Sequence, residues 1–302
     1  MSKEKYCIFD VKGGLGKHIA ATAVAKCIKN NYPSRKLIVV CVYTDVFMNL
    51  PFVDRVYQLG ATNYFYQNYI ENQDSLIFSN EPYLTTDHIH KKLPLIQSWC
   101  KMYNLEYKGE TPELIFNSLQ KKISKDVWVK KDKPVMVIHT NGGLITPDSK
   151  PYMWARDMPF DIAQQIVDRY HKKYTIYQCT KVNSPKLTNA NVIQWDDNTR
   201  LSTLEFLSVI IHSDKRILID SCLQHAAAAL KLPSVVLWNG TSPKVFGYDM
   251  HTNIETIKPQ NFKLPGSYLF DFDFNGVEHE YPFDENENLF DIDRICEAID
   301  TV

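Results

Sequence analysis

The stretch that decides the fold runs from Ile217 to Pro243 and reads ILIDSCLQHAAAALKLPSVVLWNGTSP. It opens on a continuously apolar run, which is typical of a strand in a parallel sheet that helices cover on both faces. Asp220 and Ser221 then form a helix N-cap pair, and the four alanines that follow let a helix approach the sheet closely. A second buried strand follows at 235–238. The pattern predicts a strand–helix–strand unit of an α/β domain.

Two turns of this unit are predicted to bind a phosphate. Ligands of open α/β sheets bind outside the carboxyl ends of the strands, and both turns lie there. The first is Asp220-Ser221 and the second runs from Asn239 to Pro243. Each is expected to offer free backbone N–H groups, which suit an anionic phosphate.

Composition sets broad bounds on the protein. The 302 residues fit two α/β domains or one large one, and 44% hydrophobic with 23% charged residues is ordinary for a soluble protein. No apolar run approaches the roughly 20 residues that span a bilayer, and the sequence shows no signal peptide. The seven cysteines are scattered without a Cys-x-x-Cys pair, which favours reduced thiols over zinc or disulfides. We expect a cytoplasmic protein, either free or peripheral at the inner membrane face.

Charge is unevenly distributed along the chain. Residues 1–150 hold 20 basic and 14 acidic residues, a net +6, whereas residues 151–302 hold 14 and 21, a net −7. This asymmetry suggests two domains with different partners. Chance unevenness plus an acidic tail at 266–291 is the alternative.

Alternating strand and helix patterns predict two Rossmann-like, doubly wound α/β domains that face a cleft. The first is expected over residues 1–130, where strand 6–10, a glycine-rich turn and helix 18–31 follow one another. The Lys-rich segment 120–134 is interpreted as the linker. The second domain is expected over 131–288, and a last amphipathic helix over 289–302.

The glycine-rich turn KGGLGKH, residues 12–18, is open to three interpretations. It resembles the P-loop of partition-type ATPases, but His18 stands where a P-loop needs a hydroxyl for Mg²⁺, and no clear Walker-B strand accompanies it. It could instead direct backbone N–H groups and a helix dipole at a ligand across the cleft. The third interpretation is a tight structural turn.

The chain as a whole resembles glycosyltransferase family nine, the heptosyltransferase-type enzymes of GT-B architecture. Residues 13–22, GGLGKHIAAT, are similar to the family's first turn and helix, and DSCLQHAAAAL from Asp220 is similar to its Asp-Thr-Gly-Leu-x-His-x-Ala-Ala-Ala. Further similarities are Tyr32-Pro33, residues 51–56, and Gly240-Thr-Ser-Pro at the family's spacing. The resemblance covers most of residues 5–250.

The resemblance implies a donor site for a nucleotide-sugar in the second domain. Asp220, Ser221 and Cys222 would lie at the diphosphate, and His225 would orient that turn or touch the donor. Arg156 would contact and neutralise the leaving phosphate. The remaining expected donor-site residues are Gly14, Gly16, Thr140, Asn141, Gly142, Thr241 and Ser242. The alternatives are a satisfied helix histidine at 225 and a surface ion pair between Arg156 and Asp157.

One position departs from the family pattern. The family usually has an aspartate, the expected general base, directly after the glycine that Gly16 matches, and this chain has Lys17 there. A protonated lysine cannot remove a proton from an acceptor hydroxyl. Asp10, His18 and Asp45 are the candidate replacements, and Lys17 could hold an anionic acceptor or a donor phosphate.

These observations predict an inverting, metal-independent glycosyltransferase without a cofactor. A saccharide or glycolipid acceptor is expected first and a DNA base second, because the +6 first half suits an anionic glycolipid and equally a nucleic-acid backbone. The aromatic residues at 61–107 could stack on a flipped base, but core packing explains most of them more simply. A P-loop ATPase and a non-catalytic nucleotide-sugar binding protein remain as alternatives. His88-x-His90 lacks an evident third metal ligand and is interpreted as a loop.

Overall fold

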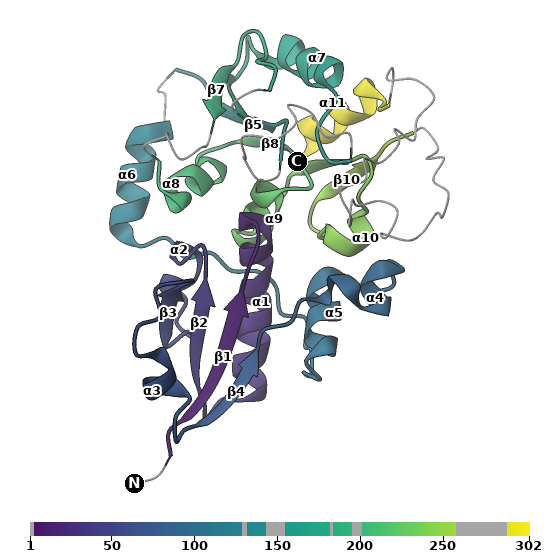
Figure 1. Ribbon diagram of the computed structural model, residues 1–302. Helices are drawn as coiled ribbons and strands as arrows, with labels where there is room; N and C mark the ends of the chain where they lie inside the picture. The colour runs from purple at the N-terminus through teal and green to yellow at the C-terminus, as the bar shows by residue number, and fades with distance from the viewer. Residues whose placement is uncertain (1–2, 129–131, 143–154, 182–183, 195–200, 258–288) are drawn as a thin grey trace.

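The computed structural model describes residues 3–128, 132–142, 155–181, 184–194, 201–257 and 289–302. Over these residues the chain forms two parallel sheets with helices packed on them, one sheet in each half (Figure 1). Four strands build the first sheet and six the second. The predicted fold class, two doubly wound α/β domains, is confirmed.

The first sheet has the order β3-β2-β1-β4, and its strand pairs are all parallel. Its elements are β1 (Lys5–Val11), α1 (Leu15–Asn31), β2 (Lys36–Cys41), α2 (Asp45–Met48), β3 (Arg55–Gln58), α3 (Phe65–Tyr69), β4 (Asp74–Phe78), a 3₁₀ turn (Pro82–Leu84), α4 (Thr86–Ile89) and α5 (Leu95–Met102). The central strand β1 is almost wholly buried because helices cover the sheet.

The second sheet has the order β10-β9-β8-β5-β6-β7, again parallel throughout. Its half of the chain contains α6 (Ser118–Trp128), β5 (Val135–His139), α7 (Phe160–Tyr170), β6 (Thr175–Thr180), β7 (Asn191–Gln194), α8 (Thr203–Leu207), a 3₁₀ turn (Ser208–Ile210), β8 (Lys215–Ile219), α9 (Cys222–Ala229), β9 (Val235–Trp238), α10 (Pro243–Phe246), β10 (Thr252–Glu255) and α11 (Ile292–Thr301). The strand–helix–strand unit predicted from Ile217 onward is therefore β8–α9–β9.

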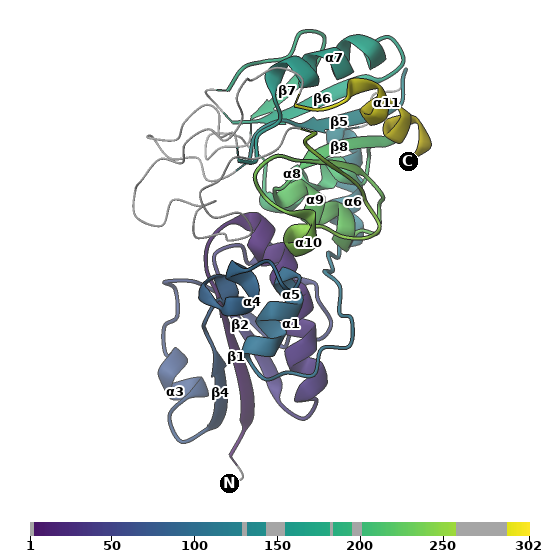
Figure 2. The same ribbon diagram turned by 90° about the vertical axis from the view of Figure 1, so that its right-hand side faces the viewer.

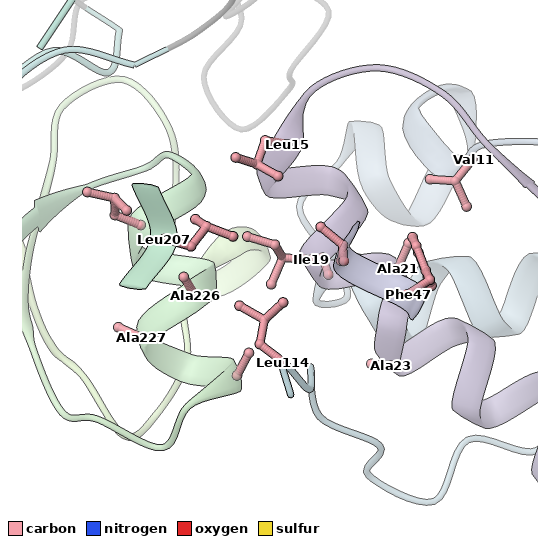
Figure 3. Close-up of a cluster of buried hydrophobic side chains, with 14 of the residues drawn as sticks. Val11, Leu15, Ile19, Ala21, Ala23, Phe47, Leu114, Leu207, Ala226 and Ala227 are labelled. Carbon is pink, nitrogen blue, oxygen red and sulfur yellow. The ribbon is translucent and has the colours of Figure 1, made fainter. Parts of the chain in front are cut away.

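Helix α1 joins the two domains through apolar contact. It is rich in alanine and buried nearly all round, as a helix between several layers must be. Figure 3 shows Leu15 and Ile19 of α1 close to Leu207 and Ala226 of the second domain, and these side chains belong to one hydrophobic core. The domains are thus packed directly on each other at the amino end of α1, where α9 also begins.

The first part of the predicted linker is helical. Residues 118–128 form α6, and the indole of Trp128 donates hydrogen bonds to Ser208 Oγ (2.8 Å) and to the Glu205 carbonyl (3.1 Å). This part of the chain therefore docks on the second domain. The expected acidic tail lies mostly outside the described residues, and α11 packs its apolar face into the core beneath the second sheet.

Most aromatic residues of the 61–107 segment serve the core of the first domain. Tyr69, Phe78 and Trp99 are at least 92% buried. Tyr64 and Tyr66 are exposed, but they lie at α3, at the end of the first domain remote from the second (Figure 1). No helix among the described residues has the length and apolar character that crossing a membrane requires.

Candidate functional site

Asp220 lies at the carboxyl end of β8, directly before Ser221, the N-cap residue of α9. It is only 5% exposed. Burial raises the pKa of the Asp220 carboxyl, and the positive charge of Arg156 and the hydroxyl of Thr241 act in the opposite direction. The structure therefore brings together three predicted site residues that come from three separate turns.

Arg156 is held beside this turn by the chain that precedes it. The carbonyl of Ala155 accepts hydrogen bonds from the N–H groups of Gly240 (3.0 Å) and Thr241 (3.3 Å). The Arg156 charge also acts, after the larger effect of burial, on the pKa values of His225 and of Tyr83 in the first domain. A guanidinium group in this position, at the boundary of the two domains, suits a diphosphate.

The predicted role of the second turn is wrong in one respect. The N–H groups of Gly240 and Thr241 point at the Ala155 carbonyl, so they are not available to a phosphate. Ser242 is the N-cap residue of α10, and its hydroxyl accepts a hydrogen bond from the N–H of Lys244 (3.3 Å). This turn fixes the backbone next to Arg156 instead of binding the anion through its own amides.

Asp157 does not form the surface ion pair considered for Arg156, because it is fully buried. Its carboxylate accepts hydrogen bonds from the backbone N–H of Gly142 (3.0 Å) and from Asn141 Nδ2 (2.9 Å). A Cβ atom at Gly142 would stand 2.9 Å from the Cβ of Ser221, which is closer than such atoms pack. Asp157 therefore fastens the turn after β5 tightly against the Ser221 turn, and only glycine fits between them.

Thr140 and Asn141 brace the sheet and turn their polar groups inward. The Thr140 N–H donates to the carbonyl of Cys179 (3.0 Å), and its hydroxyl accepts from Gln178 Nε2 (3.1 Å). Asn141 Oδ1 accepts a hydrogen bond from the Thr180 hydroxyl (2.7 Å). Gly142, the third predicted residue of this turn, packs against Ser221.

The amino ends of α1 and α9 meet at Gly16. A Cβ atom there would lie 3.3 Å from the backbone N and Cα of Cys222 and 2.9 Å from Cδ2 of His225. Gly14, the N-cap residue of α1, faces open space beside this contact. Two helix amino ends therefore bring their positive dipole ends to one place, where an anion is stabilised.

Two side chains of α9 at this contact are electrically neutral near pH 7. Burial raises the pKa of the Cys222 thiol to about 11. Burial lowers the pKa of His225 to about 3, and the charges of His251 and Arg156 lower it further. His225 Nδ1 lies 2.8 Å from the hydroxyl of Tyr248, so the histidine is satisfied by a hydrogen bond while it touches Gly16 across the domain boundary.

His18 is unsuited to act as the base, because it is buried and both its ring nitrogens form hydrogen bonds. Its Nε2 accepts a hydrogen bond from the N–H of Val42 (3.2 Å), which leaves Nδ1 to donate to the Gly14 carbonyl (3.0 Å). The side chain is fully buried, and burial lowers its pKa to about 4. Both ring nitrogens are thus used to tie α1 to the end of β2.

Lys17 forms an ion pair with a carboxylate that the sequence patterns do not single out. Its Nζ lies 2.6 Å from Oε1 of Glu81, and the two side chains are 10% and 30% exposed. The same ammonium group lies 5.2 Å from the ring centroid of Tyr83. A signal was present, because Glu81 closely follows the carboxyl end of β4, which is the neighbour of β1 in the sheet.

The engagement of Lys17 and His18 weakens the P-loop interpretation. A P-loop needs its lysine on the nucleotide phosphates and a hydroxyl on Mg²⁺, and here these positions hold an ion-paired lysine and a buried histidine. Asp10, the other carboxylate of this turn, lies 3.3 Å from Lys12 Nζ through Oδ2 and is 22% exposed. Asp45 stands in the first turn of the short helix α2.

His88 packs at the domain boundary. It is 2% exposed, and its ring lies 5.0 Å from the Tyr83 ring and 5.7 Å from the Phe246 ring of α10, between centroids. Figures 1 and 2 show α10 next to α4, which carries His88. Within the described parts of the chain, no three His, Cys, Asp or Glu side chains gather in a way that could hold a metal ion.

An open pocket of about 310 Å³ lies along the carboxyl ends of β9 and β10. The second domain lines it with residues 239–242, Glu255 and Thr256, and the first domain contributes Lys91. Thr241 lines this pocket, and its hydroxyl also acts on the pKa of Asp220. The size of the pocket is at the lower end of the range for small-molecule sites.

No protein-family model matches the chain, and no curated protein matches its sequence.

Solved structures match its fold. A family 9 glycosyl transferase from Veillonella parvula superposes with a TM-score of 0.67 at 11% identity, covering 100% of this chain and 98% of that one. The dodecameric glycosyltransferase TibC of enterotoxigenic E. coli gives 0.65 at 13% identity, covering 99% and 77%. The E. coli ADP-heptose lipopolysaccharide heptosyltransferase II gives 0.60 at 11% identity, covering 82% and 90%. The chain therefore shares the GT-B fold of these enzymes.

Proposed function

We propose that this protein is a glycosyltransferase that moves a sugar from a nucleotide-sugar to an acceptor hydroxyl with inversion and without a metal ion. The observation that carries the proposal is the position of Arg156 beside the buried Asp220, at the point where the amino ends of α1 and α9 meet. Neighbours in fold support it, because E. coli heptosyltransferase WaaC has been solved with ADP and TibC with ADP-D-β-D-heptose.

The donor binds against the second domain in this proposal. Its diphosphate lies at the amino end of α9, where Ser221 and the first amides of the helix face it, and Arg156 neutralises the charge that grows as the nucleoside diphosphate leaves. The charge of Arg156 opposes the effect of burial on Asp220, so the two charges favour each other at this turn. Positive helix ends and a guanidinium group supply the charge stabilisation for which other transferases use a divalent cation.

The acceptor binds against the first domain, and a saccharide or glycolipid fits best. The net +6 charge of residues 1–150 suits an anionic acceptor of this kind. A DNA base is less well supported, because the exposed Tyr64 and Tyr66 lie at α3, away from the domain boundary. The buried aromatic residues of the same segment are taken up by the core.

A thermal-shift screen across UDP-, GDP-, ADP- and CMP-sugars tests the donor site. We expect one class to raise the melting temperature of the wild type, since a ligand at 100 times its Kd adds about 2.7 kcal/mol to the stability of the folded state. The Asp220→Ala variant should lose this shift. Stabilisation by ATP with Mg²⁺ alone, abolished by Lys17→Ala and kept in Asp220→Ala, would show that the protein is a P-loop ATPase instead. Donor binding without transfer to any acceptor or to water would identify a non-catalytic binding protein.

A further inference from the structure

We propose that Glu81 is the carboxylate that takes the proton from the acceptor hydroxyl, and that Lys17 is the residue that positions it. This inference rests on the proposed glycosyl transfer and adds the missing base to it. The sequence has Lys17 at the position where a base was expected, and the structure places the carboxylate of Glu81, from the turn after β4, next to the Lys17 ammonium group.

The position of Glu81 fits the task. Its Oε1 accepts a hydrogen bond of 2.6 Å from Lys17 Nζ, and the side chain is 30% exposed, so the carboxylate is both fixed and open on one side. Lys17 donates its hydrogen bond to Oε1, so Oε2 is left to accept a hydrogen bond from an acceptor hydroxyl. Among the described residues, Lys17 is the hydrogen-bond donor to this carboxylate.

Tyr83 connects Glu81 with the donor side of the site, because Lys17 Nζ, which binds Glu81 Oε1, lies 5.2 Å from the centroid of the Tyr83 ring. The charge of Glu81 acts on the Tyr83 hydroxyl from the first domain, while Arg156 and Asp220 act on the same hydroxyl from the second domain. The charges of Glu81 and of the Arg156–Asp220 pair thus reach the same side chain. A sugar carbon next to the diphosphate and an acceptor next to Glu81 would meet beside this tyrosine.

The other candidate bases are less suited. His18 uses both ring nitrogens on backbone groups and is fully buried. Lys17 is an ammonium group in an ion pair and has no proton-accepting capacity in that state. Asp10 pairs with Lys12, and its Oδ1 is buried without a hydrogen-bond partner among the described residues, so only its paired oxygen faces outward.

The step is balanced without a further reactant. The acceptor O–H proton passes to a Glu81 oxygen while the hydroxyl oxygen forms a bond to the anomeric carbon of the donor. The bond from that carbon to the diphosphate oxygen breaks on the opposite face, and its electron pair leaves with the nucleoside diphosphate beside Arg156. The proton is then released from Glu81 to water, and Lys17 stays protonated throughout.

Azide separates this role from a structural one, because it is an anionic nucleophile that carries no proton to remove. The probe is the nucleotide-sugar that stabilises the wild type most in the thermal-shift screen, and release of nucleoside diphosphate is measured with water and with azide as the attacking group. In Glu81→Gln we expect turnover with water to fall about 10²–10⁴-fold, the contribution of a positioned base, with KM for the donor nearly unchanged. Azide should restore turnover and yield a glycosyl azide.

The control is Glu4→Gln, which removes a carboxylate from another lysine pair of the same domain, Lys36 Nζ–Glu4 Oε2 at 2.7 Å, at the opposite end of β1. Its turnover should equal that of the wild type. Full activity of Glu81→Gln with water, or an equal loss with water and azide, overturns the role of Glu81. A wild type that binds no nucleotide-sugar overturns the proposed function itself, which is a different result.

Discussion

The turn from β1 into α1 and the turn from β8 into α9 are built on the same plan in the two domains. Each follows a buried parallel strand, and each helix carries a histidine four residues after its cap residue, His18 after Gly14 and His225 after Ser221. Burial lowers the pKa of both histidines. Yet His18 bonds only to backbone of its own domain, whereas His225 touches Gly16 of the other.

The charges at the two turns also differ. In the first domain the lysine after the glycine turn is paired with Glu81, and the pair is partly exposed. In the second domain a carboxyl, Asp220, is buried, and an arginine acts on it from a neighbouring turn. The comparison teaches that one strand-turn-helix plan serves two kinds of chemistry: one turn presents a carboxylate that can accept a proton, and the other presents positive charge to an anion.

The strongest test of this difference is Arg156→Ala. If the turn from β8 into α9 and the neighbouring Arg156 stabilise a leaving diphosphate, losing the guanidinium group should lower turnover about 10²–10³-fold, the usual cost of one electrostatic stabiliser. Steady-state release of nucleoside diphosphate measures this. Arg169→Ala is the control, because Arg169 is half-exposed and pairs with Asp293 on the far side of the domain. Equal turnover in the two variants would refute the proposal that Arg156 and the β8–α9 turn stabilise the diphosphate.

Acid pH should destabilise the protein through the buried, neutral histidines that the two turns share, His18 and His225. An unfolded histidine binds a proton below about pH 6.5, while folded His18 stays neutral down to about pH 4. The free energy of unfolding should therefore fall as pH drops from 6.5 towards 4, by about 1 kcal/mol per pH unit for each such histidine, and stay constant above that range. Urea unfolding at pH 7.5, 6.5 and 5.5 measures the slope.

Replacing one histidine at a time sharpens that result. His18→Asn and His225→Asn should each reduce the acid slope by about one proton, since both residues are buried in the folded state. The exposed His90→Asn is the matched control and should leave the slope unchanged. A slope that neither buried-site variant alters would mean that these histidines are not kept neutral by the fold.

Gly16→Ala tests how closely the two turns pack. A Cβ atom at this position would meet Cys222 backbone at 3.3 Å and His225 at 2.9 Å. We expect a net loss of about 1–2 kcal/mol, because overpacking outweighs the gain of about 1 kcal/mol that alanine brings to a helix. Gly14→Ala, where nothing lies within 4 Å, should cost less, about 0.5 kcal/mol, which is the preference of an N-cap position for glycine over alanine. Thermal unfolding compares the two, and a Gly16→Ala variant as stable as Gly14→Ala would contradict the close contact.

The smallest expected effect belongs to Tyr248→Phe. It removes the hydroxyl that lies 2.8 Å from His225 Nδ1 and should cost about 1 kcal/mol of stability. Donor binding should weaken little, because Tyr248 supports His225 and is not placed at the diphosphate. A loss of turnover as large as that of Arg156→Ala would instead assign the Tyr248 hydroxyl to the reaction.

Sequence patterns predict the fold class and the place of the turn between β8 and α9. Apolar runs of strand length, cap residues and the alanine-rich helix are local properties, and they are sufficient to identify β8, α9 and β9. Because ligand sites in such sheets lie at the carboxyl ends of strands, the strand pattern indicates Asp220, and the family resemblance adds Arg156, which the tertiary structure brings beside it. The segment 120–134, by contrast, has the lysines typical of a linker, yet its first part is helical and docks through Trp128.

What a side chain or an amide faces was decided only by the tertiary structure. Lys17 and Glu81 are 64 positions apart in sequence, and they meet because β4 pairs with β1. The amides of Gly240 and Thr241 are occupied because both donate to the carbonyl of Ala155, the residue before Arg156. The carboxylate of Asp157 is buried, and it accepts a hydrogen bond there from the N–H of Gly142. Local patterns fix where strands and helices begin, but partners of polar groups depend on the order of strands in the sheet and on the packing of turns, and these follow from the whole chain.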